Sequence, residues 1–155
     1  MTDLDMLEDR EFCTCRVGPL LLGIEVDRVQ EVLFQSEYTE VPRTDSHIAG
    51  LINLRGQIAT AIDLRVKLDV EANEDNEDVH IVVRYRGEPV SLLVDDIGDV
   101  ITVPQSTFEA TPETLTGVAK ELIAGAYKLE DSLLLSLDTS QVIATSTGSF
   151  QEIAR

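Results

Sequence analysis

The chain of 155 residues contains no tryptophan and few other aromatic residues, with four phenylalanines and three tyrosines. Valine, isoleucine and leucine must therefore fill the core, and where they run in short blocks they favour β structure. The same shortage argues against a module that binds proline-rich peptides, because aromatic side chains line such grooves. At this length the chain suits one domain, or two very small domains that share a core.

Basic residues are also scarce, since 12 lysines and arginines stand against 29 acidic residues and the formal net charge is −17. Without a basic stripe, no nucleic-acid partner is expected. Much of the acidity lies in residues 1–11 and 69–78, which we interpret as a solvated tail and loop. Residues 69–78 lack the central glycine of a calcium-binding loop, so the sequence predicts no metal site there.

Cysteine is nearly absent, and no targeting or membrane-spanning segment is evident. Cys13 and Cys15 lie two residues apart, where a disulfide would be strained, so we predict free buried thiols in a reducing compartment. The acidic N-terminus lacks the apolar core of a signal peptide, and no stretch approaches the ~20 apolar residues of a membrane helix. We therefore expect a cytoplasmic protein without direct membrane insertion.

Catalytic signatures are missing as well. No serine lies in a nucleophile elbow, and there is no glycine-rich phosphate loop. His47 and His80 are far apart, and neither has a second ligand at metal-binding spacing. The sequence predicts no catalytic residue, no metal and no cofactor.

What the sequence does contain is an internal repeat. Residues 26–32 match residues 94–100 at an offset of 68, and residues 48–50 match residues 123–125 at an offset of 75. Each half predicts five short strands, which is typical of a small SH3-like barrel that is marginal alone. We predict a mainly β protein with two five-stranded SH3-like barrels packed together with short helices. Strand exchange between the halves stays open.

Residues 50–65 organise the first half, because they predict a strand, a tight turn at Gly56, a second strand and a helix start. Asp63 and its repeat partner Asp138 are predicted helix N-caps. An alternative pairs these two carboxylates as in the duplicated aspartic proteases. Against it, Asp63 lacks the following threonine and glycine and has Arg65 two residues away.

Arg55 is a lone cation at the tip of this otherwise apolar hairpin. One interpretation is a solvated turn residue, which is commonplace for arginine. The other is a recognition residue, since arginine is enriched at binding hot spots. Glu31 has the same two interpretations, as a surface acid or as an ion-pair partner of Arg55.

The motif formed by Gly50, Asn53, Leu54, Arg55 and Gly56, followed by residues 62–65, resembles the central signature of the CheW family of chemotaxis coupling proteins. The resemblance also takes in Phe12 and residues 23–32, 93–97 and 133–138, and it implies the same pair of barrels. The implied organisation is a flexible acidic tail at 1–10, barrel 1 at 11–68, an acidic loop at 69–78, barrel 2 at 79–144 and a flexible tail at 145–155.

The resemblance implies an adaptor and not an enzyme. Such a protein joins the cytoplasmic tip of a chemoreceptor to the regulatory domain of a CheA-type histidine kinase, and we expect a monomer that joins membrane-associated receptor arrays. The implied partner-binding residues are Val29, Glu31, Gly50, Asn53, Arg55 and Gly56, with Glu31 and Arg55 facing each other across adjacent strands. The alternatives are a hydrolase that uses Asp63 and Asp138, or a generic SH3-like peptide-binding module.

Overall fold

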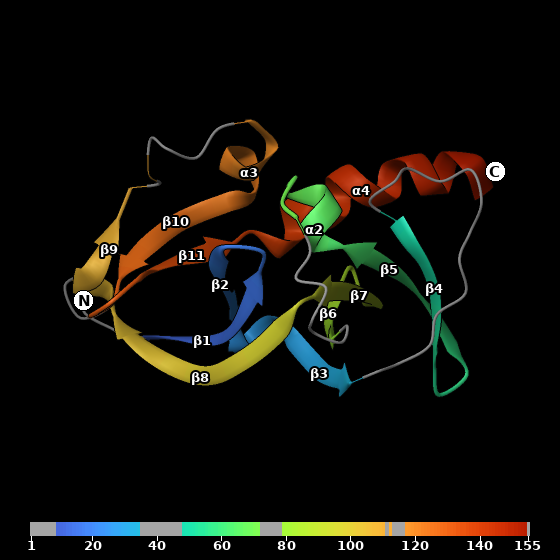
Figure 1. Ribbon diagram of the computed structural model, residues 1–155. Helices are drawn as coiled ribbons and strands as arrows, with labels where there is room; N and C mark the ends of the chain where they lie inside the picture. The colour runs from blue at the N-terminus through green and yellow to red at the C-terminus, as the bar shows by residue number, and fades with distance from the viewer. Residues whose placement is uncertain (1–8, 35–47, 72–78, 111, 113–116, 155) are drawn as a thin grey trace.

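The computed structural model describes residues 9–34, 48–71, 79–110, 112 and 117–154, and within them the protein is mainly β (Figure 1). The strands are β1 (Asp9–Val17), β2 (Leu20–Glu25), β3 (Val29–Phe34), β4 (Ile48–Leu54), β5 (Gln57–Asp63), β6 (Val79–Tyr85), β7 (Glu88–Val94), β8 (Asp96–Pro104), β9 (Phe108–Glu109), β10 (Ile123–Lys128) and β11 (Leu133–Leu137). The helices are η1 (Val26–Arg28), α2 (Leu64–Lys67), η2 (Gln105–Thr107), α3 (Gly117–Leu122) and α4 (Thr139–Ala154).

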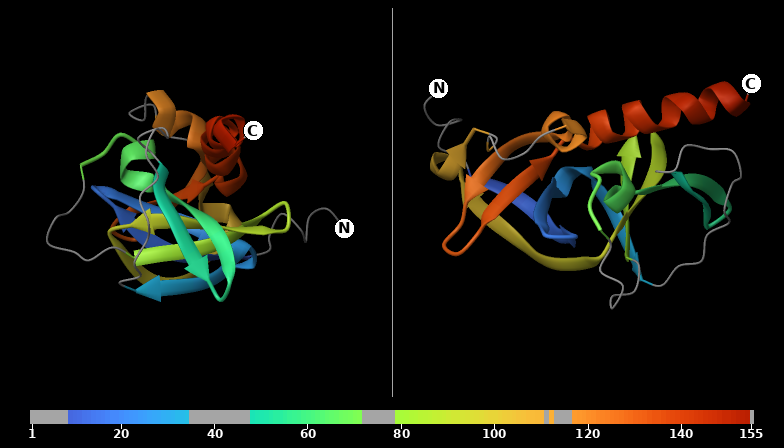
Figure 2. Two further views of the ribbon diagram at one scale, coloured as in Figure 1. Left: turned by 90° about the vertical axis from the view of Figure 1, so that its right-hand side faces the viewer. Right: turned by 45° about the horizontal axis from the view of Figure 1, so that its top comes forward.

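The strands form two curled sheets that lie side by side (Figures 1 and 2). The first sheet has the order β8-β1-β2-β11-β10-β9, and the second has the order β3-β6-β7-β5-β4. Each contains one parallel pair, β2 with β11 and β5 with β7. The predicted two-barrel, SH3-like architecture is confirmed, although the two-residue β9 gives the first sheet a sixth strand.

Neither barrel is built from one half of the repeat. Strands β1 and β2 pair with β8 and β11 of the second half, whereas β6 and β7 pair with β3 and β5 of the first half. The halves thus exchange their first hairpins, and the predicted division into barrels at 11–68 and 79–144 is corrected. The physical reason is the short η1 after β2 and the bend at Asp95 after β7, which carry the chain directly from one sheet into the other.

One apolar core runs through both barrels. Its buried side chains come from both sheets, and α4 adds Val142 and Ile143. The central strands β6 and β7 are buried on almost every residue, which explains their unbroken apolar runs. Each buried valine, leucine or isoleucine contributes about 1.5–3 kcal/mol, so the shared core stabilises two barrels that are small on their own.

The two cysteines carry free thiols and are both buried in β1, as predicted. A β-bulge lies between Cys13 and Cys15, where β1 pairs with β8. Burial raises the pKa of both thiols, because the charged thiolate is poorly solvated there. Both therefore stay protonated at neutral pH and are poor nucleophiles.

The C-terminal segment differs from the predicted flexible tail at 145–155, because α4 continues to Ala154. Val142, Ile143 and Ser146 are buried at helical spacing, and the Ser146 hydroxyl donates to the Val142 carbonyl at 2.7 Å. Packing of this face stabilises a helix that composition alone does not favour. Most of the predicted acidic tail and loop, residues 1–8 and 72–78, lies outside the described residues.

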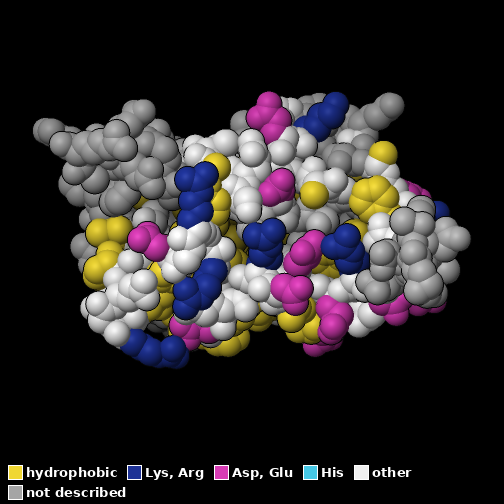
Figure 3. Space-filling model, turned by 180° about the vertical axis from the view of Figure 1, so that it is seen from behind, with side chains coloured by type: hydrophobic (Ala, Val, Ile, Leu, Met, Phe, Trp, Pro, Cys, Tyr) yellow, Lys and Arg dark blue, Asp and Glu magenta, His cyan; other side chains and the backbone are white. Residues whose placement is uncertain are grey.

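The surface of the described residues mixes charges of both signs. The view from behind shows basic and acidic side chains interspersed across the middle of that face (Figure 3). Among the helices that the structure describes, none combines the length and the apolar character needed to cross a membrane.

Candidate partner-binding site

The β4–β5 hairpin presents the predicted turn at its tip, which Figure 2 (left) shows from the front. Arg55 and Gly56 have φ angles of +53° and +88°, and positive φ at both central residues is typical of a type I′ turn. The Asn53 side-chain oxygen accepts a hydrogen bond from the Gly56 backbone N–H at 2.8 Å. Asn53 and Gly56 thus shape a turn that leaves the Arg55 side chain 81% exposed.

Arg55 is oriented by an ion pair. Its Nη2 donates to Oε2 of Glu31 at 2.8 Å. Strands β3 and β4 are the opposite edges of the second sheet, so the pair joins the two edges at the rim of the barrel. The two residues do meet, but not across adjacent strands as the sequence analysis expected. With Arg55 so exposed, the pair adds only ~0–1 kcal/mol, and its main effect is to hold the guanidinium in place.

An apolar cluster lies beneath this pair and holds the two edges together. Ile52, Leu54 and Ala59 of the hairpin pack with Val82 of β6, and Leu33 of β3 covers the cluster. The hairpin tip therefore packs against strands from the other side of its sheet. We call Glu31, Asn53, Arg55 and Gly56, which lie above this cluster, the Arg55 rim.

Val29 and Gly50 lie on the strands that lead to the rim. Val29 begins β3, is half-buried and packs against the main core. Gly50 is buried in β4, next to a bulge and opposite Ala61. The structure therefore brings four of the six predicted residues together at the rim, whereas Val29 and Gly50 lie elsewhere on β3 and β4 of the same barrel.

One exposed apolar residue beside the rim was missed by the sequence analysis. Ile58 is 60% exposed and lies directly opposite Asn53 in the hairpin. The alternation of β5 gives no warning of this exposure, because Ile58 lies on the same face of the strand as Ile62, which is fully buried. An arginine beside an exposed apolar side chain is typical of surfaces that bind proteins.

Comparison with known proteins points to one family. The model of the CheW-like domain matches residues 11–147. The chemotaxis protein CheW of Klebsiella aerogenes is 29% identical over 137 residues, which cover 88% of this chain and 82% of that protein. Chemotaxis protein CheW of Bacillus subtilis is 34% identical over 122 residues, which cover 78% of each chain.

A solved structure agrees with these sequence matches. The crystal structure of the scaffolding protein TtCheW from Thermoanaerobacter tengcongensis has a TM-score of 0.74 and 26% identity, covering 84% of this chain and 89% of that one. The chain belongs to the CheW family. It is accordingly a chemotaxis scaffold, or adaptor, and not an enzyme.

Both predicted N-cap residues of this CheW-family chain lie at helix starts. The Asp63 carboxylate accepts from the Arg65 backbone N–H at 3.0 Å and from the Arg65 Nε at 2.9 Å. The Asp138 carboxylate accepts from the Gln141 backbone N–H at 3.0 Å. Both residues are described, and no hydrogen bond joins their carboxylates, so the paired arrangement that a hydrolase of this kind requires is not formed.

Of the two histidines, the structure describes His80. His80 is fully buried, and its Nδ1 lies 2.8 Å from the Ser91 hydroxyl, within hydrogen-bonding distance. His47 lies outside the described residues. Among the residues that the structure describes, no three histidine, cysteine or acidic side chains gather as metal ligands would.

Proposed function

We propose that this CheW-family adaptor couples the cytoplasmic tip of a chemoreceptor to the regulatory domain of a CheA-type histidine kinase. Its proposed coupling surface comprises Val29, Glu31, Gly50, Asn53, Arg55 and Gly56. The observation that carries the proposal is Arg55, which is 81% exposed yet held by Glu31 at 2.8 Å.

The geometry of the Arg55 rim suits recognition of a protein. A guanidinium has five N–H donors, and the bond to Glu31 occupies one of them, so donors remain for a partner. Because the ion pair and the turn already orient the side chain, less conformational entropy is lost on binding. Ile58, 60% exposed on the same hairpin, adds apolar area next to the charge.

On this proposal the protein works in the cytoplasm as a monomer that joins receptor arrays at the membrane. It requires no cofactor, because the signal passes through binding alone. The relatives, which are chemotaxis proteins and a scaffolding protein, support a scaffolding role in chemotaxis.

Titration calorimetry against the regulatory domain of a CheA-type kinase from the same organism tests the proposal. We expect micromolar binding, about −8 kcal/mol. Arg55→Ala should weaken binding by about tenfold or more, as for a hot-spot arginine. Arg86→Ala is the matched control, because Arg86 has the same φ of +53° at the tip of the β6–β7 hairpin.

The outcomes separate clearly. Equal affinities of the wild type and both variants for the kinase would remove Arg55 from the kinase interface, and loss of receptor binding alone would assign it to the receptor. No binding to either protein, with all components folded, would contradict the proposal.

A further inference from the structure

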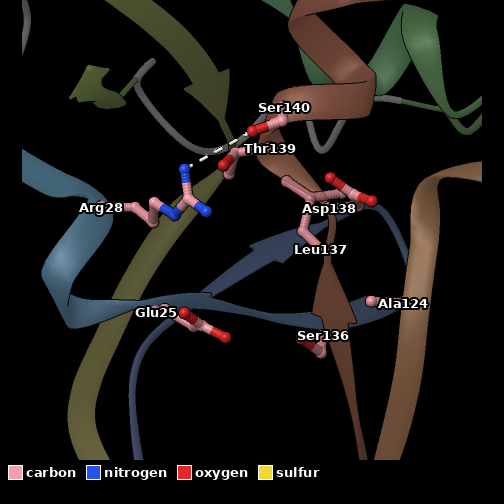
Figure 4. Close-up of a pocket in the computed structure, with 8 residues that line it drawn as sticks. All are labelled: Glu25, Arg28, Ala124, Ser136, Leu137, Asp138, Thr139 and Ser140. Atoms are coloured by element: carbon pink, nitrogen blue, oxygen red, sulfur yellow. Dashed lines mark hydrogen bonds between the residues drawn. The ribbon is translucent and has the colours of Figure 1, made fainter. Parts of the chain in front are cut away.

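A pocket of about 200 Å³ lies where β2 and η1 meet the end of β11 and the start of α4 (Figure 4). Its lining includes Ser136, the carboxylates of Glu25 and Asp138, and Arg28, whose Nη1 lies 3.5 Å from the Ser140 hydroxyl. The pocket therefore combines charges of both signs and selects no one class of ligand. The segment that follows β8 is more informative.

Residues 105–109, which we call the strap, consist of the single turn η2 and the two-residue strand β9. The strap continues the chain from β8 and lies beside β10 at the edge of the first sheet (Figure 1). Two residue pairs join it to β10, Glu109 with Ala126 and Phe108 with Tyr127. Since β10 has six residues, the strap covers only part of its edge.

The repeat indicates that a barrel of this kind forms without the strap. Apart from β9, the first sheet has the order β8-β1-β2-β11-β10, and the second has the order β3-β6-β7-β5-β4. The parallel pairs, β2 with β11 and β5 with β7, occupy equivalent places in the two sheets. Within the part of the chain that the structure describes, no strand pairs with the outer edge of β4, which is the counterpart of β10. The strap is thus an addition to a five-stranded barrel.

Phe108 anchors the strap to the barrel. Its ring lies against Gly125, where an added Cβ would collide with the ring. It also meets the Tyr127 ring edge-on, with the ring centroids 5.3 Å apart, and Tyr127 in turn packs against Phe12. Phe108 is nevertheless 45% exposed. A partly exposed ring with one edge-on aromatic contact holds the strap only weakly.

The other polar contacts of the strap do not bind it to the barrel. The Thr107 hydroxyl donates to the Pro104 carbonyl at 2.7 Å, and the Phe108 N–H donates to the Gln105 carbonyl. Both bonds lie within residues 104–108 and can move with the strap. The Oε1 atom of Gln105 is buried and has no hydrogen-bond partner. Because burial of an unpaired acceptor is unfavourable, its return to water favours opening of the strap.

We propose that the strap is a hinged cover that opens while both barrels stay folded. When closed, it shields part of the β10 edge and the Tyr127 ring, which is 4% exposed. When open, it uncovers backbone N–H and C=O groups of β10, with which another extended segment can pair. Phe108 holds the cover closed, and the buried Gln105 oxygen destabilises the closed state. This opening is independent of the Arg55 rim, which lies on the other sheet.

Amide hydrogen exchange of the ¹⁵N-labelled full chain tests this inference. Those of the Glu109, Ala126 and Tyr127 amides that bond β9 to β10 should exchange at least about tenfold faster than the amides that join β1 with β2, because local opening exposes only the first set. Phe108→Ala should accelerate this exchange by about tenfold again. Phe34→Ala, which truncates another exposed phenylalanine, should leave it unchanged.

Two further variants change the opening in opposite directions. Gly125→Ala should accelerate exchange of the strap amides as Phe108→Ala does, because the new Cβ displaces the ring. Gln105→Met should slow it about threefold, since the unpaired oxygen is removed. Gln141→Met, at an exposed position of α4, is the matched control that leaves it unchanged.

The rates decide the proposal. If the strap amides of the wild type exchange as slowly as the β1–β2 amides, the strap opens only when the barrel unfolds, and the proposal is overturned. Equal acceleration of both sets of amides in Phe108→Ala would overturn it as well, because β9 would then be an integral strand of the barrel.

Discussion

Arg55 combines an unfavourable backbone conformation with an exposed charge. A φ of +53° costs a residue with a Cβ about 1–2 kcal/mol relative to glycine. The ion pair with Glu31 stabilises the folded protein by only ~0–1 kcal/mol. Folding therefore gains little from arginine at this position, and a role in binding gives a physical reason for its presence.

Replacing Arg55 by glycine separates these two effects. We predict that Arg55→Gly keeps or raises the free energy of unfolding, since relief of the positive φ offsets the lost ion pair, within about 1 kcal/mol. The same variant should lose partner affinity. Urea denaturation and calorimetry measure the two quantities, with Arg86→Gly as the control that keeps its affinity. A drop in stability as large as the drop in binding energy would argue for a purely structural Arg55.

The buried thiols predict how stability depends on pH. The thiols of Cys13 and Cys15 have raised pKa values in the folded protein, caused first by burial, against a value of 9.0 without that burial. The contribution of the buried thiols to the free energy of unfolding is complete below about pH 9. It is lost above that pH, because the thiols of the unfolded chain ionise before those of the folded protein.

Urea denaturation between pH 8 and pH 10 should therefore show a falling free energy of unfolding above pH 9. Each thiol that stays protonated in the folded protein at pH 10 should add a slope that approaches about 1.4 kcal/mol per pH unit. Cys15→Ala should be less stable throughout but have a shallower slope. Parallel slopes in the two proteins would contradict this account of the thiols.

At the scale of elements, the start of α4 depends on Asp138. The carboxylate accepts the Gln141 N–H at 3.0 Å, and the Asp138 carbonyl accepts the Val142 N–H at 3.0 Å. We predict that Asp138→Ala lowers the free energy of unfolding by about 0.5–2 kcal/mol, as the loss of an N-cap does. Amide exchange of residues 140–142 should also accelerate.

Asp138→Asn is the control for this prediction, because asparagine caps helices about as well as aspartate does. It should retain most of the stability. If both substitutions cost the same, the negative charge and not the cap would be what stabilises the helix start.

Local features of these elements could be predicted from the sequence, and non-local ones could not. Asp63, Asp138 and Gly56 act on backbone groups within three residues, so the chain around them carries the signal. The exchange of hairpins is non-local, because β1 pairs with β8 of the second half and β6 pairs with β3 of the first half. Since β3 and β8 occupy equivalent positions in the repeat, the sequence does not indicate which of them each hairpin pairs with. Ser136 likewise lies in an apolar strand, and nothing nearby in sequence indicates that its hydroxyl borders a pocket.

At the scale of the whole molecule, Asp95 links the two barrels. It is 2% exposed and follows β7, which belongs to the barrel formed by the second sheet, β3-β6-β7-β5-β4. Its carboxylate accepts from Arg65 Nη1 at 3.2 Å and from the Gly18 N–H, in the β1–β2 turn of the first barrel, at 2.7 Å. The hydrogen bond from Gly18 thus joins the exchanged hairpins in addition to the shared core. The ion pair holds Asp95 to α2, which follows β5 of the same sheet as β7.

We predict that Asp95→Ala lowers the free energy of unfolding by about 3 kcal/mol. The substitution removes one of the carboxylates that balance the positive charge of the buried Arg65 guanidinium, and it leaves the Gly18 N–H without its acceptor. Asp95→Asn should lose less, since the amide oxygen can still accept from Gly18. Urea denaturation followed by two probes, one in each barrel, measures the effect. A loss below about 1 kcal/mol in Asp95→Ala would show that the core alone holds the barrels together.

Receptor-dependent autophosphorylation of the kinase tests the proposed coupling most directly. Receptor-containing membranes and a CheA-type kinase from the same organism are assayed with and without this protein, using wild type, Arg55→Ala and Arg86→Ala. The account predicts that wild type and Arg86→Ala raise kinase activity in the presence of receptor, whereas folded Arg55→Ala raises it far less. Equal activation by Arg55→Ala, or no activation by the wild type with every component folded, would contradict it.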